Sequence, residues 1–67
     1  MINIKLNGKD KQIREGITIQ GLLEEMDFQS KMFVVEKNLE ILPKEHYDSY
    51  IIAKGDCIEI VGFFGGG

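Results

Sequence analysis

The sequence predicts a small α+β domain in which one helix packs on one face of a mixed β-sheet. Residues 2–6 alternate apolar and polar side chains, which is typical of a strand with one buried face. Residues 19–26 place their apolar side chains at helical spacing instead. Two further apolar runs, at residues 32–35 and 57–63, have the length of strands. Several strands with one helix and no internal repeat favour a single sheet covered on one side.

The first strand is expected to turn back at once as a hairpin. Asn7-Gly8 is the dipeptide best suited to a tight turn whose residues have positive φ. The polar stretch 9–14, in which only Ile13 is apolar, predicts a second strand at an edge of the sheet. Gly16 is expected to end that strand.

The helix is expected to follow Thr18, whose hydroxyl can accept a hydrogen bond from the first free backbone N–H groups. The apolar side chains of one face come at the spacing i, i+3, i+4 and i+7: Ile19, Leu22, Leu23 and Met26. This spacing predicts about ten helical residues. Gly21 in the first turn weakens the helix by about 1 kcal/mol.

The second half of the chain predicts further strands and an irregular connection. The continuous apolar run 32–35 is typical of a strand that is covered on both faces or lies deep in a sheet. Asn38 marks a turn, and a short strand at 39–42 stops at Pro43 because proline has no N–H for the ladder. Residues 44–50 are mixed and polar, and we expect an irregular segment with one helical turn.

The last strand is expected to carry a surface that binds a partner. Lys54-Gly55-Asp56 predicts a turn, and residues 57–63 predict the strand. If Ile58 and Ile60 point toward the helix, alternation turns the neighbouring side chains away from it: Cys57, Glu59, Val61 and Phe63. Exposed apolar groups favour a partner site, and we predict one formed by Glu59, Val61, Phe63 and Phe64.

Composition limits the classes of function. The chain has 67 residues, 43% of them hydrophobic and 28% charged, which favours one globular domain. A net charge of −3 argues against nucleic acid binding, which needs a basic surface, and favours a basic protein partner. We find neither an apolar run long enough to span a membrane nor a signal peptide pattern. We therefore expect a cytoplasmic protein with neither nucleic acid nor a membrane as its partner.

No group of side chains suggests catalysis or metal binding by the chain itself. Cys57 is the single cysteine and has no activating neighbour in the sequence, so we interpret it as a small buried hydrophobic residue. His46 is a lone histidine in a polar segment, where we expect a solvated loop residue. We expect neither a catalytic residue nor a metal ligand.

The run Gly65-Gly66-Gly67 is the most informative feature for function. Residues without a Cβ atom can neither pack nor hold a fixed backbone, so we expect a mobile tail at 65–67 after a folded domain at 1–64. Such a tail can enter a channel in which side chains would clash, and it presents the carboxylate of Gly67 there. A frayed end without function is the alternative. The apolar strand that runs up to the tail favours a reactive terminus.

Three segments together resemble the ThiS family of sulfur carrier proteins: residues 38–44 (NLEILPK), 54–56 (KGD) and 59–67 (EIVGFFGGG). The resemblance spans the whole chain and implies the ubiquitin-like β-grasp fold, a mixed sheet of four to five strands with one main helix on one face. Two positions depart from the family pattern. Leu39 stands where many members have glycine, which affects the turn, and Tyr47 stands where tryptophan is frequent.

The resemblance also implies a role in thiamine biosynthesis in which the chain is a co-substrate and not an enzyme. A ThiF-like adenylyltransferase would activate the carboxylate of Gly67 with ATP and Mg²⁺, while Gly65 and Gly66 thread its active site. A cysteine desulfurase would supply the sulfur that turns the adenylate into a thiocarboxylate. A ThiG-like thiazole synthase would receive this sulfur, and the carrier itself would bind no cofactor.

Two other functions stay open at this point. The small subunit of molybdopterin synthase has the same kind of tail, although such chains tend to be somewhat longer. A β-grasp module that only docks on a partner would have an inert glycine end. Sulfur transfer to Gly67 separates the docking module from the two carriers, and the identity of the sulfur acceptor separates the carriers from each other.

Overall fold

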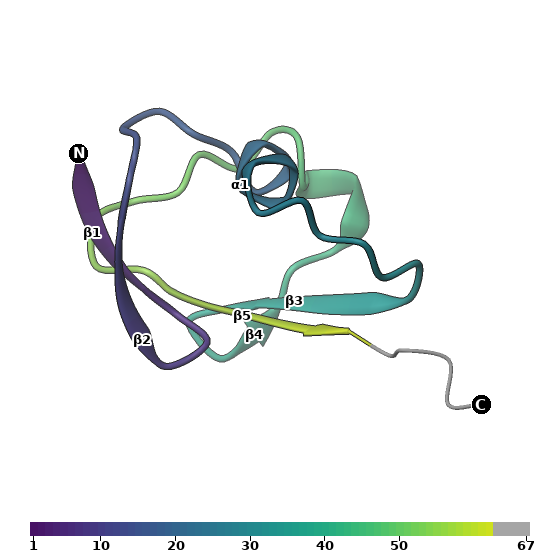
Figure 1. Cartoon of the computed structure of the whole chain (residues 1–67). Coiled ribbons are helices and arrows are strands. Elements are labelled where there is room, and N and C mark those ends of the chain that lie inside the picture. Colours follow the sequence, from purple (N-terminus) through teal and green to yellow (C-terminus); the bar gives the residue numbers. More distant parts are fainter. Residues whose placement is uncertain (63–67) are drawn as a thin grey trace.

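Residues 1–62 are described in the computed structural model of the chain, and residues 63–67 lie outside the described part. Within residues 1–62, five strands form one sheet, and a single α-helix crosses one of its faces (Figure 1). The elements in chain order are β1 (Ile2–Leu6), β2 (Lys9–Ile13), α1 (Ile19–Glu25), β3 (Phe33–Lys37), β4 (Glu40–Ile41), the 3₁₀-helix η1 (Lys44–His46) and β5 (Cys57–Gly62). No helix in residues 1–62 is long and apolar enough to cross a bilayer.

The strand order in the sheet is β2-β1-β5-β3-β4, so the last strand along the chain lies in the middle. β1 and β5 pair in parallel, with Leu6 opposite Ile58, whereas the other neighbours pair antiparallel. A parallel pair needs a long crossover, and the segment with α1, β3 and β4 forms it. The predicted mixed sheet is confirmed, and so is the edge position of β2.

β1 and β2 are joined by the predicted tight turn. Asn7 and Gly8 have φ angles of 52° and 82°, and Leu6 pairs with Lys9 across the turn. Positive φ at both central residues gives a type I′ turn, whose twist matches that of the flanking strands. The Asn7 side chain also reaches β5, where its Oδ1 accepts a hydrogen bond of 2.8 Å from the Ile60 N–H.

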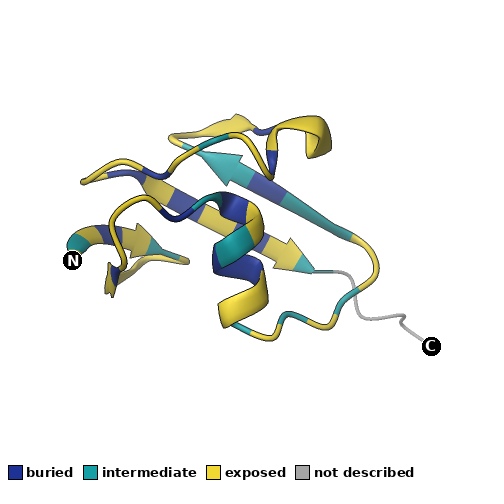
Figure 2. Cartoon of the chain, turned by 90° about the horizontal axis from the view of Figure 1, so that it is seen from above, coloured by how far each residue is buried: buried dark blue, intermediate teal, exposed yellow. Residues whose placement is uncertain are grey.

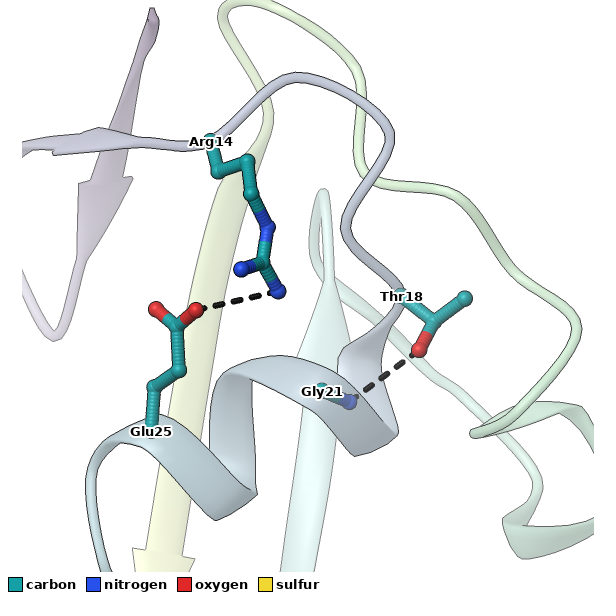
Figure 3. A network of polar contacts seen from close by, with 4 residues as sticks. All are labelled: Arg14, Thr18, Gly21 and Glu25. Carbon is teal, nitrogen blue, oxygen red and sulfur yellow. Dashed lines mark hydrogen bonds and ion pairs between the residues drawn. The ribbon is translucent and has the colours of Figure 1, made fainter.

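α1 begins after Thr18, as the sequence predicts. The Thr18 Oγ1 accepts a hydrogen bond of 3.0 Å from the Gly21 N–H and satisfies one of the free donors of the first turn (Figure 3). Three apolar side chains of the predicted face are buried: Ile19, Leu22 and Leu23.

α1 has 7 residues and is shorter than the periodicity predicts. Met26 is the C-cap, and Asp27 has a φ of 53°, a left-handed conformation that ends the helix. Near this end, Glu25 forms an ion pair of 3.0 Å with Arg14, which follows β2 (Figure 3). The last residue of the apolar spacing, Met26, is therefore the C-cap and not part of the helix.

The hydrophobic core lies between α1 and the face of the sheet that it covers. Figure 2 shows buried and exposed residues alternating along β5. Ile58 and Ile60 of this strand are buried in the core, which confirms that they point toward the helix. The other buried apolar side chains within residues 1–62 are Ile4, Ile13, Ile17, Ile19, Leu22, Leu23, Val35, Leu42, Tyr47 and Ile52.

β3 lies deep in the sheet, between β5 and β4, but it is not covered on both faces. Val35 is buried against the helix side, whereas Val34 is only half-buried and the preceding Met32 is 68% exposed. Of the two expectations for this run, a place deep in the sheet is confirmed and cover on both faces is not, because within residues 1–62 a single helical layer covers the sheet. The continuous apolar run instead supplies side chains to an open face.

The connection from β4 to β5 follows the prediction. η1 is the expected helical turn, and Tyr47 after it packs into the core with its ring centroid 5.9 Å from that of Phe33. His46 is exposed, as expected for a solvated residue. The turn before β5 is confirmed as well, with a φ of 84° at Gly55.

The hairpin between β3 and β4 turns on two residues that both have positive φ. Asn38 has a φ of 51° and Leu39 a φ of 72°. Asparagine adopts this conformation readily, but for leucine the Cβ atom crowds the following carbonyl oxygen, at a cost of about 1–2 kcal/mol. Leu39 is 89% exposed, so no burial offsets the strain. β4 itself covers only Glu40–Ile41, less than the predicted strand at 39–42.

We predict that Leu39→Gly stabilises the protein by about 1 kcal/mol, because glycine adopts a positive φ without steric cost. The midpoint of urea unfolding measures the gain. Leu39→Ala is the matched control: it removes the same exposed side chain but keeps the Cβ atom, so its midpoint should stay near that of the parent. An equal gain in both variants would show that the strain does not lie in the backbone at this turn.

Candidate functional site

The face of the sheet opposite α1 carries the residues of β5 that the sequence assigns to partner binding. Cys57, Glu59 and Val61 are all exposed, and Val61 keeps 49% of its accessible surface. The predicted orientation of these three side chains is therefore confirmed. Phe63 and Phe64, predicted as part of the same surface, lie outside the described residues, as do Gly65, Gly66 and Gly67.

The register of the strands adds side chains from β3 and β4 to this face. Val34 lies opposite Val61, and Glu36 lies opposite Glu59. On its other side Glu36 pairs with Ile41, which is 68% exposed. Directly paired residues share a face of a sheet. We call these five residues the open-face patch: Val34, Glu36, Ile41, Glu59 and Val61.

The open-face patch combines an apolar part with a pair of like charges. The carboxylates of Glu36 and Glu59 lie on directly opposite positions, an arrangement that destabilises a sheet by a few tenths of a kcal/mol. No ion pair between either carboxylate and a cation is found in residues 1–62. A cationic group of a partner would therefore remove a repulsion as well as add an attraction.

Gly62 ends β5 at a point where two residues of the preceding connection approach closely. A Cβ atom at Gly62 would lie 3.0 Å from Phe28 Cζ and 3.1 Å from Ser30 Cβ. On this side of the strand, the loop after α1 therefore occupies the space of a side chain. On the other side, Val61 and the open-face patch lie immediately beside the point where the chain leaves the sheet.

The interpretation of Cys57 as a buried residue is wrong, because its thiol lies on the open face. The cause is its position: alternation along β5 buries Ile58 and exposes the residues on either side of it. In the register between β1 and β5, Cys57 lies beside Lys5. Within residues 1–62 no three side chains of the metal-binding types gather into a cluster.

A buried carboxylate that sequence reasoning missed holds the start of β5. Asp56 is only 7% exposed and accepts hydrogen bonds from the Tyr50 hydroxyl, from Asn38 Nδ2 at 3.1 Å and from the Ala53 N–H at 2.9 Å. Asn38 Oδ1 in turn accepts from the Cys57 N–H at 2.9 Å. The Asp56 network thus ties the β3–β4 turn to the first residue of β5.

The Asp56 network shifts the pKa values of two of its members. Burial alone would raise the pKa of Asp56, but the hydrogen bonds from Tyr50, Ala53 and Asn38 outweigh it and lower this pKa below the ordinary value of 3.8. Burial, together with the hydrogen bond to Asp56 and its negative charge, raises the pKa of Tyr50 to about 12. Each shift favours the protonation state seen in the network at neutral pH.

The topology of this chain defines its class. A mixed five-stranded sheet with parallel β1 and β5, folded around one helix, is the ubiquitin-like β-grasp fold, as predicted. The model of the ThiS family matches residues 4–67. The chain therefore belongs to the ThiS family.

Individual relatives agree with this assignment. The sulfur carrier protein ThiS of Bacillus subtilis is 45% identical over 65 residues, which cover 96% of this chain and 98% of that protein. The crystal structure of the thiamine biosynthesis protein ThiS from Geobacter metallireducens superposes with a TM-score of 0.83 at 32% identity, over 98% of this chain and 100% of that one.

A second kind of relative is much longer. The thiazole synthase of Paramagnetospirillum magneticum is 38% identical over 66 residues, which cover 98% of this chain but only 20% of that protein. The chain thus spans about a fifth of the length of this relative, and the likeness concerns that part alone.

We predict that Asp56→Asn lowers the free energy of unfolding by about 2 kcal/mol at pH 7, because hydrogen bonds to a buried charge are lost. Since the folded pKa is below the unfolded one, the stabilisation is complete above the unfolded value and disappears as the pH falls below about 4. Denaturation at pH 7 and pH 3 should therefore show a difference that shrinks in acid. Asp48→Asn, at an exposed position, is the control. An equal difference at both pH values would contradict this role for the Asp56 charge.

The same network predicts an alkaline limit. The folded pKa of Tyr50 is raised from 10.0 to about 12, so its stabilisation is complete below 10.0 and is lost as the pH rises toward about 12. Tyr50→Phe should flatten the pH dependence of unfolding in this window, although it costs about 1 kcal/mol at neutral pH through the lost hydrogen bond. If the free energy of unfolding of this variant fell as steeply with pH in the same window, the alkaline loss of stability would belong to another titrating group.

Proposed function

We propose that this chain carries sulfur as a thiocarboxylate on Gly67 and delivers it for thiazole formation in thiamine biosynthesis. The observation that carries the proposal is the 45% identity to the Bacillus subtilis sulfur carrier protein ThiS over almost the full length of both chains. The relation to a structure described as a thiamine biosynthesis protein favours this pathway over molybdopterin synthesis. In this role the chain is a protein co-substrate and not a catalyst.

The chemistry explains why such a carrier needs a partner enzyme. A terminal carboxylate is ionised at neutral pH and is a poor acylating agent. In the proposed first step, an oxygen of the Gly67 carboxylate attacks the α-phosphorus of ATP, and pyrophosphate leaves. The outer sulfur of a persulfide then attacks the acyl carbon, and AMP leaves with the bonding electron pair. A thiol reductant next cleaves the S–S bond of this acyl disulfide, which leaves the thiocarboxylate and a mixed disulfide. Mg²⁺ and basic groups of a ThiF-like adenylyltransferase would stabilise the charge on the phosphates.

The partners follow from the two ends of this sequence of reactions. A cysteine desulfurase supplies the sulfur, and a ThiG-like thiazole synthase receives it. The thiazole synthase relative supports the second assignment, because one part of that protein resembles this whole chain. When a carrier and its acceptor occur in one polypeptide in a relative, the separate proteins are expected to bind each other. We propose that the carrier acts in the cytoplasm.

The open-face patch is the proposed docking surface for the adenylyltransferase. Val34 and Val61 offer an apolar contact beside the end of β5, and the paired carboxylates of Glu36 and Glu59 select a partner with lysine or arginine at the facing position. We propose that Phe63 and Phe64 extend this surface and that Gly65 and Gly66 thread the active site. This assigns residues 1–64 to the folded domain and residues 65–67 to the tail.

We predict that Glu59→Gln makes the fold more stable but weakens binding to the adenylyltransferase. Removing one of two facing carboxylates should raise the free energy of unfolding by about 0.5 kcal/mol. Affinity for the cognate ThiF-like enzyme should nevertheless fall several-fold, with a weaker dependence on salt, because a charge pair across the interface is lost. Calorimetry at two salt concentrations measures both effects. Glu15→Gln removes the same charge from an exposed position outside the patch and should change neither.

We predict that Gly66→Ala folds normally but loses adenylation and thiocarboxylate formation by about 100-fold or more, since small misplacements of a reacting group cost that much. Incubation with ATP, Mg²⁺, the cognate adenylyltransferase and a sulfur source, followed by intact mass, detects the replacement of oxygen by sulfur. Gly16→Ala adds the same methyl group at a φ of 90°, in the connection between β2 and α1. It should lose stability yet accept sulfur while folded.

The outcomes separate the candidate functions. Full sulfur transfer to the Gly66→Ala variant would refute the hypothesis that the active-site channel of the adenylyltransferase has no room for a side chain at this position. Failure of the parent chain to gain sulfur under these conditions would favour the module that only docks on a partner. A thiocarboxylate that supports molybdopterin formation but not thiazole formation would assign the chain to the other pathway.

A further inference from the structure

The end of β5 is paired on one edge only. β3 pairs with β5 as far as Gly62, whereas β1 pairs with it only at Cys57 and Ile58. In Figure 1 the arrowhead of β5 lies beside β3, beyond the turn between β1 and β2. Among residues 1–62, no strand lies against the β1 side of β5 after Ile58.

The backbone groups that face this edge can be identified. Along a strand, successive residues direct their N–H and C=O groups to opposite edges. Cys57 C=O accepts from the Asn38 N–H on the β3 side, and Ile58 C=O accepts from the Asn7 N–H on the β1 side. Residues 60 and 62 therefore share the orientation of Ile58. Their N–H and C=O groups point to the edge that β1 leaves open.

One of these groups is already satisfied by a side chain. The Ile60 N–H donates to Asn7 Oδ1 at 2.8 Å, which fills the place where a further residue of β1 would have bonded. The Ile60 C=O, the Gly62 N–H and the Gly62 C=O continue the row beyond Asn7. We call residues 60–62 on this side the open strand edge. In the sequence, residue 63 and the glycine run follow it.

Exposed strand edges are templates for pairing with another chain, and proteins recognise extended peptides in this way. The edge strands of this sheet are poor occupants for a second copy, because β2 carries Lys9 and Lys11 and β4 has only 2 residues. Val61, between Ile60 and Gly62, belongs to the open-face patch. A protein that docks on the patch therefore meets the open strand edge at the same time.

We propose that the adenylyltransferase which activates Gly67 adds an extended segment of its own to the open strand edge, with hydrogen bonds to the Ile60 C=O and the Gly62 N–H. This inference rests on the proposed function and deepens it. The added strand takes the place beside β5 that β1 vacates after Leu6. Backbone pairing on both edges then fixes the direction in which the chain leaves the sheet, so the tail enters the active site from a rigid start.

Hydrogen exchange at single amides tests the proposal directly. The ¹⁵N-labelled full chain is compared free and in complex with the cognate ThiF-like adenylyltransferase, without ATP so that the complex does not turn over. The Gly62 N–H should exchange at least about tenfold more slowly in the complex. The Val61 N–H, which already faces β3, is the internal control and should change much less. Unchanged exchange at Gly62 in a saturated complex would overturn the proposal.

A chemical variant provides the second arm. Cys57 allows a synthetic peptide of residues 57–67 to be joined to residues 1–56, and the peptide can carry an N-methyl group on Gly62. This methyl group removes the proposed donor and blocks the edge without touching the pairing with β3. Affinity for the adenylyltransferase should fall at least about tenfold. Gly62→Ala keeps the N–H and places its methyl group toward Phe28, so it controls for altered packing.

The results distinguish this proposal from the proposed function. Thiocarboxylate formation together with undiminished affinity of the folded N-methyl variant would overturn strand addition and leave the sulfur carrier role intact. Absence of both binding and adenylation in the parent chain would overturn the carrier role and strand addition together. The expected result is slow exchange of the Gly62 N–H in the complex, together with weaker binding of the N-methyl variant and unchanged binding of Gly62→Ala.

Discussion

The parallel pairing of β1 with β5 is the constraint on which the rest of this structure depends. It brings Leu6 beside Ile58, 52 positions apart in the chain, and places the last strand in the centre of the sheet. The crossover between them must then pass over one face, where α1 buries Ile58 and Ile60. Because β3 and β1 hold β5 from both sides along its first residues, the position of Gly62 is set by the whole sheet. Beyond Ile58 the strand is held through β3 alone, as far as Gly62.

Local patterns sufficed to predict most elements of the fold. The alternation in residues 2–6, the Asn7-Gly8 turn and the Thr18 cap each reflect chemistry within a few residues of the chain. The helix is shorter than predicted because Met26, the last residue of the apolar spacing, is the C-cap, and the left-handed backbone of Asp27 follows it directly. The sequence left open whether β3 is covered on both faces or only lies deep in the sheet, because an apolar run indicates a strand but does not say how many layers cover it.

The candidate site was predictable only along a single strand. Alternation in β5 places Glu59 and Val61 on the open face, but their neighbours Val34 and Glu36 follow from the register, which local sequence does not specify. The Asp56 network was missed for the same reason, since Asn38 lies 18 residues away.

Leu39 shows the limit of propensity: a leucine at positive φ is disfavoured by its own backbone, and Asn38 anchors the turn despite that cost. The structural role of the residues after Gly62 stays a prediction.

The hydrogen bond from the Ile60 N–H to Asn7 also bears on the chemical ageing of the protein. Asparagine followed by glycine is the pair most prone to lose ammonia, because the next backbone nitrogen attacks the side-chain carbonyl carbon and forms a succinimide ring. In the folded chain the side-chain carbonyl of Asn7 is held toward β5 by its hydrogen bond from the Ile60 N–H, which restricts the rotation that ring closure needs. Deamidation should therefore proceed mainly through the unfolded state, and a stock of this protein would lose its first hairpin at a rate set by how often the sheet opens.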